Sequence, residues 1–203
     1  MGQVMTIDGW KALFILTFRA PEAAARAVLG LGLSRVELLL SLTLMTALNA
    51  IVFSVFFQIS KTQIAASGIF PPAYQSPTVY AVLTGGMSVL TVVALLWSGR
   101  SMGGRGTLDG FLAVITWLQV LRLAVQSLVL MLLFVMPTVA GMLAIFGNLW
   151  GIWILINFVK VAHAFDNIGR AAAVLIMAVM VGLFGLTLIV ALIGGAARIG
   201  GAS

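Results

Sequence analysis

The side chains with the greatest chemical potential lie on one long apolar stretch, residues 111–135. Polar residues recur in it at spacings of three or four, which places them on one face of a helix. They are Thr116, Gln119, Arg122 and Gln126. At ~1.5 Å per residue Arg122 lies roughly 16 Å into the stretch, near the middle of a bilayer. A charge there costs about 2.5–3.5 kcal/mol, so Arg122 is expected to have a partner.

Two interpretations of Arg122 are open. In the first, its guanidinium bonds to Asn49, Asn148 or Asn157 of neighbouring helices, or to free backbone carbonyls, and holds a bundle together. In the second, it holds a lipid phosphate or a small anion in a cavity, since a guanidinium can bind phosphate with two parallel hydrogen bonds. No Asp or Glu lies at comparable depth, so the chain cannot form a buried ion pair with itself.

His163 is the only histidine and the chain has no cysteine, so a third metal ligand is lacking beside Asp166. No metal and no cofactor is therefore expected, and we expect His163 at a helix end near lipid head groups. The five carboxylates are not paired within any span, and no nucleophile motif is present. These observations favour a non-enzymatic protein.

The sequence contains two glycine patterns. Gly147 and Gly151 form a small-xxx-small pattern that allows close helix packing, either within the chain or in a homodimer, and we favour the former. The glycine-rich residues 99–106 lack the lysine and following serine or threonine of a nucleotide-binding loop. They instead indicate a tight turn, with Arg100 and Arg105 facing lipid phosphates.

Composition shows what kind of element must position these residues. Of the 203 residues 62% are hydrophobic and only 8% are charged, with a mean hydropathy of +1.20. This identifies a membrane protein with one domain and no separate soluble domain. The net charge of +6 suits contact with anionic lipids. It does not indicate nucleic-acid binding, because the cations are spread over several loops.

Residues 1–33 are expected to form an interfacial amphipathic segment. Its charged residues fall within one narrow arc of a helix, and Pro21 is expected to divide that helix. They are Asp8, Lys11, Arg19, Glu22 and Arg26. A secretory signal peptide is the less favoured alternative, because no small-residue cleavage site follows before further charges.

Residues 34–198 are expected to form an all-α bundle of five transmembrane helices, followed by a tail, 199–203. The predicted spans are 36–58, 79–97, 111–135, 138–159 and 171–193. Helix starts are indicated by a capping box at Ser34 and Glu37, by Ser76 with Pro77, by Thr107 with Asp109, and by Asp166 or Asn167. Lys61 ends the first span, and Tyr74 and Tyr80 are expected at head-group level.

The cations also predict an orientation. Those expected to contact head groups on the N-terminal side are Lys11, Arg19, Arg26, Arg100, Arg105, Lys160 and Arg170. Arg35 lies on the same side, whereas Lys61 and Arg198 lie on the other. The positive-inside rule then places the N-terminus in the cytoplasm and the C-terminus outside. With a composition that looks bacterial, this predicts a bacterial inner-membrane protein with a periplasmic C-terminus.

The chain resembles bacterial members of the Yip family, the Ypt/Rab-interacting membrane proteins. The resemblance covers roughly residues 29–195 and is carried by the five spans, the loop 103–108 and the connection from Trp150 and Trp153 to His163 and Arg170. The resemblance implies the fold and the membrane topology, and it implies less about the molecular function. The chain lacks the long acidic or proline-rich N-terminal region that eukaryotic members use for partners, so binding of a GTPase is not expected.

Two functions follow as hypotheses. The first is a non-enzymatic membrane protein that organises lipids or serves as an accessory or scaffold subunit of a larger membrane complex or homo-oligomer. The second is a small transporter or channel-like subunit with an anion or lipid site at Arg122. A water-accessible cavity that reaches Arg122 would favour transport, and a closed polar stripe bonded to Asn49 or Asn148 would favour the scaffold.

Overall fold

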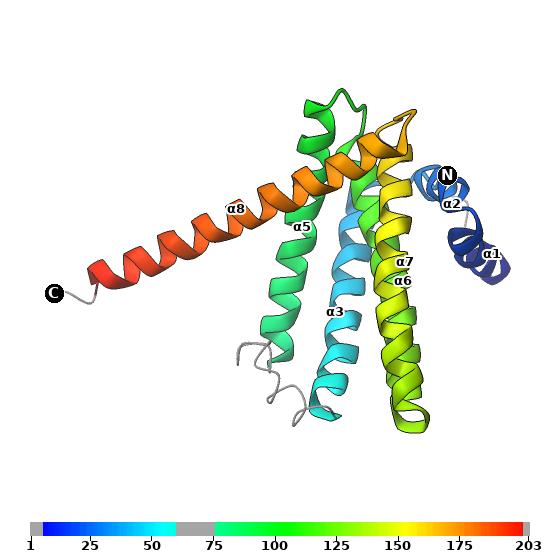
Figure 1. The fold of residues 1–203 in the computed structure, drawn as a ribbon, viewed down its shortest axis with the longest axis horizontal. Helices are drawn as coiled ribbons and strands as arrows, with labels where there is room; N and C mark the ends of the chain where they lie inside the picture. Colours follow the sequence, from blue (N-terminus) through cyan, green and yellow to red (C-terminus); the bar gives the residue numbers. More distant parts are fainter. Residues whose placement is uncertain (1–5, 60–75, 201–203) are drawn as a thin grey trace.

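The chain folds into helices alone in a computed structural model that describes residues 6–59 and 76–200, with side chains through Phe184. The helices are α1 (Ile7–Arg19), α2 (Pro21–Leu29), α3 (Arg35–Ile59), α5 (Pro77–Ser101), α6 (Leu108–Val135), α7 (Pro137–Ala162) and α8 (Ile168–Gly200). Figure 1 shows α3, α5, α6 and α7 side by side as a bundle of long helices. The short pair α1 and α2 lies on one flank, and α8 leaves the bundle on the other.

The four long helices are each long and apolar enough to cross a membrane, with mean hydropathies of 2.0–2.1. They agree with the first four predicted spans. α6 lies between α3 and α7, and α5 packs on α3 (Figure 1). The helix α8 packs on α5 and α7, and its apolar part with described side chains is the shorter range Ile168–Phe184. The predicted fifth span, 171–193, extends beyond those side chains and stays a prediction.

The helix starts agree with the local signals. Glu37 accepts hydrogen bonds from the backbone N–H and the hydroxyl of Ser34, at 2.7 and 2.8 Å, as in a capping box. Ser76 and Thr107 cap α5 and α6 through their side chains. Asn167 accepts from the N–H of Gly169 at the start of α8. Lys61 and Tyr74 lie outside the described residues, as does the side chain of Arg198.

Pro21 divides the N-terminal segment as predicted, because α1 ends at Arg19 and α2 begins at Pro21. The interfacial position of this segment stays a prediction, and α1 contacts α6. Trp10 stacks on Trp117 of α6 at 5.8 Å between ring centroids. The indole N–H of Trp117 also donates to the buried hydroxyl of Thr17 at 3.1 Å.

The second N-terminal helix is attached through charge and through small buried side chains. Lys160 of α7 forms an ion pair with Glu22 at 2.6 Å, and Glu22 lies 3.9 Å from Arg26. Ala24, Ala25 and Val28 are buried against α6 and α7. The N-terminal pair is therefore fixed to α6 and α7 by both polar and apolar contacts.

Candidate functional site

The polar stripe of α6 lies against α3 and α5. The side-chain amide of Gln119 donates to the hydroxyl of Ser88 on α5 at 2.8 Å. The amide of Asn49 on α3 donates to the backbone carbonyl of Gln119 at 3.1 Å. Gln119, Asn49 and Ser88 are all at least nine-tenths buried. These bonds join three helices through Gln119, whereas the structural interpretation placed Arg122 at the centre of such a network.

Arg122 has a different environment, three residues further along α6. It lies halfway along the helix, roughly 20 Å from either end at ~1.5 Å per residue. One guanidinium nitrogen donates to the hydroxyl of Tyr80 at 3.0 Å. The ring of Tyr80 in turn stacks on Phe53 of α3, with centroids 3.9 Å apart. The Arg122 side chain itself is exposed on the bundle surface.

No carboxylate of the chain compensates this charge, and all five belong to described residues. Asp8 pairs with Lys11, Glu22 with Lys160 and Arg26, and Asp109 with Arg35. Glu37 caps α3, and Asp166 is exposed in the loop before α8. Arg122 is therefore a cation at the middle of α6 whose charge no Asp or Glu of the chain neutralises.

Arg122 lines two cavities. The larger, which we call the groove, has a volume of about 470 Å³ and lies among α6, α7 and α3, with Phe18 of α1 at one side. The smaller, of about 290 Å³, lies between α5 and α6 and includes Ser88 and Gln119. The lining residues of α5, α6 and α7 lie away from the ends of those helices, whereas Phe53 and Phe56 lie in the last two turns of α3. The cavities therefore open sideways, toward the place of lipid.

The groove has polar groups besides Arg122. Gln126 and Asn148 both line it. Among the described residues, the carbonyl oxygen of the Gln126 side chain is buried without a hydrogen-bond partner. Asn148 donates to the carbonyl of Ala144 on its own helix at 2.7 Å. A side-chain amide offers both a donor and an acceptor, so the groove can bind a polar group as well as apolar surface.

The two glycines of α7 have different surroundings. A Cβ at Gly147 would lie 2.9 Å from Val125 Cγ1, so this glycine allows close packing of α7 on α6. A Cβ at Gly151 would have no neighbour within 4 Å, although Gly151 also lines the groove. Gly147 thus serves packing within the chain, whereas Gly151 leaves space.

Tyr80 lies in the first turn of α5, and its level relative to lipid head groups stays a prediction. Its side chain is 4% exposed, because it faces the bundle between Phe53 and Arg122. Ser88, which accepts from Gln119, was not predicted as a residue of the polar network. A sequence signal existed, since Tyr80, Thr84 and Ser88 follow one another at intervals of four residues and so share one face of α5. Asn157, proposed as a partner of Arg122, instead donates to the carbonyl of Trp153.

His163 lies at a helix end as predicted, as the C-cap of α7, but its side chain is buried and does not face lipid head groups. The residue is 1% exposed, and its ring accepts from the N–H of Gly106 at 3.1 Å and bonds the carbonyl of Leu95 at 3.1 Å. Since Nδ1 accepts, Nε2 carries the proton. Burial lowers the pKa of His163, the bond to Leu95 opposes this, and the charge of Arg100 lowers the pKa further.

The glycine-rich loop forms the enclosure of this ring. A Cβ at Gly99 or Gly104 would collide with the His163 ring, and one at Gly106 would lie 2.6 Å from Phe111 and 2.7 Å from the ring. We call Gly99, Gly104, Gly106 and His163 the glycine–histidine junction. The expected tight turn is also present, at Gly103 with φ of 84°.

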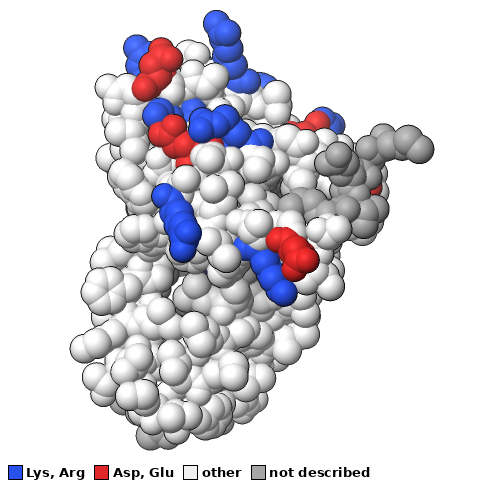
Figure 2. Space-filling model, turned by 90° about the vertical axis from the view of Figure 1, so that its right-hand side faces the viewer, with Lys and Arg blue, Asp and Glu red and all other residues white. Residues whose placement is uncertain are grey.

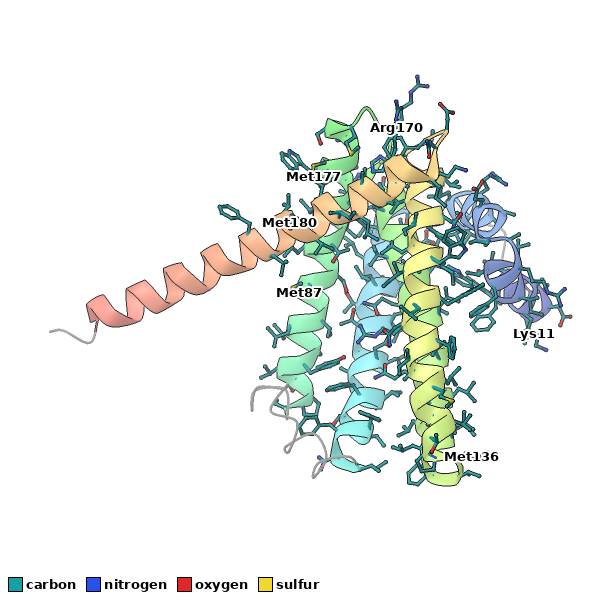
Figure 3. All side chains as sticks on the ribbon, viewed as in Figure 1. Lys11, Met87, Met136, Arg170, Met177 and Met180 are labelled. Atoms are coloured by element: carbon teal, nitrogen blue, oxygen red, sulfur yellow. The ribbon has the colours of Figure 1, made fainter. Side chains whose placement is uncertain are left out.

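The charged residues gather at the end of the bundle that holds this junction, which we call the basic end (Figure 2). Its cations are Arg26, Arg35, Arg100, Arg105, Lys160 and Arg170. Lys160 and Arg35 are paired with carboxylates, and Arg100 donates to the carbonyl of Gly106. Arg19 ends α1. Figure 3 shows Lys11 on the flank, between the levels of Arg170 and Met136.

A model of the Yip1 domain matches residues 15–189, which is most of the chain. The match includes α2, α3, α5, α6 and α7 entirely, together with parts of α1 and α8. No curated protein and no solved structure matches the chain significantly.

Proposed function

We propose that this chain, which belongs to the Yip1 family, is a non-enzymatic multi-pass membrane protein that organises anionic lipids and acts as an accessory subunit of a membrane complex. The observation that carries the proposal is the basic end. Its six cations outnumber the four carboxylates of the same helix ends and loops, which are Glu22, Glu37, Asp109 and Asp166. A positively charged end beside long apolar helices matches the charge of anionic head groups.

Arg105 and Arg170 are the cations best suited to this task. Both side chains are exposed; Arg105 belongs to the loop between α5 and α6, and Arg170 to the first turn of α8. The backbone N–H of Arg105 donates to the carbonyl of His163 at 3.1 Å, which fixes the position of the residue while its side chain extends outward. By the positive-inside rule this end faces the cytoplasm, and the proposed location is a bacterial inner membrane.

The test compares two double variants that remove the same charge. Arg105→Gln/Arg170→Gln removes cations of the basic end, and Lys11→Gln/Arg19→Gln removes cations of α1. Lipid binding is measured by native mass spectrometry after reconstitution with phosphatidylglycerol and phosphatidylcholine. At about 1 kcal/mol for each cation, the first variant is expected to lose roughly tenfold or more in affinity for phosphatidylglycerol. Equal losses in both variants would contradict a role for the basic end.

The alternative proposal is a transporter or channel-like subunit. Two cavities reach Arg122, which favours a site for an anion or lipid. Their lining on α5, α6 and α7 lies away from the helix ends, which favours lateral access over a path from one end to the other. Uptake of a small anion into vesicles that contain the protein, abolished by Arg122→Met, would support transport over the organising role.

A further inference from the structure

The groove around Arg122 can accommodate a ligand or a partner. The positive charge of Arg122 favours an occupant that carries a negative charge. The guanidinium has one hydrogen bond to Tyr80, and every carboxylate of the chain lies elsewhere. An exposed cation at mid-depth in a bilayer is stabilised by an opposite charge brought to the same depth. A second copy of this chain has the same five carboxylates in the same places, so self-association cannot supply that charge.

Depth in the membrane also distinguishes two candidate occupants of the groove, a lipid phosphate and a carboxylate on a transmembrane helix. The hydrocarbon core of a bilayer is about 30 Å thick, so lipid phosphates lie roughly 15 Å above or below its centre. Arg122 is at the middle of α6, and its side chain bonds Tyr80 within the bundle. A carboxylate on a transmembrane helix can lie at the level of Arg122 without any deformation of the bilayer.

The shape and lining of the groove fit a helix. Its volume of about 470 Å³ accommodates several side chains, and its walls include Phe53, Phe56 and Trp150. At Gly151 nothing lies within 4 Å of the place where a Cβ would be, so another backbone can approach closely. Gln126 adds a buried carbonyl oxygen with no partner in the described part of the chain.

We propose that the groove formed by Arg122, Gln126, Asn148 and Gly151 is a docking site for a transmembrane helix of another protein that carries an Asp or Glu near its midpoint. The carboxylate would accept from Arg122, and a donor one turn away would bond the Gln126 oxygen. The inference names the partner chemistry for the accessory-subunit role, and so it rests on the proposed function.

The probe is a synthetic transmembrane helix of about 20 residues, the length that spans a bilayer, made of leucine and alanine with one central Glu. The control peptide has Gln at the same position. Association with the full-length protein is measured by fluorescence energy transfer in phosphatidylcholine vesicles. We expect the Glu peptide to bind the native protein at least tenfold more tightly than the Gln peptide.

Three variants test the site itself. Arg122→Met should abolish the preference for Glu. Arg122→Glu should reverse it, so that a peptide with a central Lys binds instead. Gly151→Leu keeps the charge but fills the groove, and should weaken binding of every peptide at least tenfold. It remains informative should an Arg122 variant fail to fold, because its added side chain meets no described atom near its Cβ.

Several results would overturn the proposal. Equal binding of the Glu and Gln peptides would show that the charge is not recognised. Loss of a bound phosphatidylglycerol in Arg122→Met, without any peptide preference, would make the groove a lipid site. The chain has no cysteine, so Gly151→Cys is a clean reporter, and disulfide dimers formed through it would identify a second copy as the occupant. The lipid test with Arg105 and Arg170 is independent, so the proposed function and this inference can fail separately.

Discussion

The glycine–histidine junction and the groove each place one basic side chain among helices, but they treat it in opposite ways. His163 is enclosed by glycines, and each of its ring nitrogens has a hydrogen-bond partner. Arg122 has one such partner and an exposed side chain at the middle of α6. A polar group satisfied from within serves the fold, since leaving it unpaired would be costly. A charge left without its opposite needs something from outside the chain.

The strongest way to break the junction is to add a methyl group to it. Gly99→Ala would force its Cβ into the His163 ring. We therefore expect the free energy of unfolding to decrease by at least about 3 kcal/mol, at the upper end of overpacking effects. Thermal unfolding in detergent would measure the loss. Gly86→Ala in the same helix is the matched control, because a Cβ there meets nothing within 4 Å. A small loss at Gly99 would mean that the ring is not tightly enclosed.

Acid should weaken the junction as well. Because the pKa of His163 is lowered in the folded chain, the unfolded chain binds more protons below its usual pKa of about 6.5. Stability is therefore full above that value and decreases as pH falls toward the folded pKa, by about 1.4 kcal/mol at most for each pH unit. Unfolding midpoints at pH 7.5 and 5.5 test this. His163→Gln should show a smaller decrease than the native chain.

The attachment of α1 should show a smaller effect. Trp117→Phe removes the donor to Thr17, and the expected loss is about 1 kcal/mol, typical of one hydrogen bond. Amide hydrogen exchange should increase along residues 7–19 and stay unchanged in α3. Faster exchange throughout the bundle would show that Trp117 supports the core and not α1 in particular.

The smallest effect on stability is expected at the groove. Arg122→Met removes one hydrogen bond to Tyr80 but also removes a charge without an opposite partner, so stability in detergent should change by less than about 1 kcal/mol. The same unfolding experiment as for Gly99→Ala gives the comparison. A large loss of stability would show that Arg122, like His163, stabilises the fold.

The features that could be predicted from the sequence are those determined by neighbours along the chain. The capping box of Ser34 and Glu37 joins residues three apart, and Pro21 acts on its own helix. Each of the four long helices is similarly indicated by its own apolar run, independently of the other helices. The family resemblance, now supported by the domain match, depends on the same local patterns.

The features that could not be predicted join distant residues. The partner of Arg122 is Tyr80, 42 residues away, and the N–H that bonds His163 belongs to Gly106, 57 residues away. The sequence indicated the polar stripe, the glycine-rich loop and the histidine as separate features. Which helices become neighbours depends on packing over the whole bundle, so the junction became visible only in the fold.

The placement of Phe18 gives the groove one wall that does not belong to the four long helices. This wall is held by Thr17 and, through α2, by the ion pair of Glu22 with Lys160. Its attachment points therefore lie outside the groove. The width of the groove on this side is therefore determined by how firmly α1 and α2 are attached to α6 and α7, and not by the packing among the four long helices.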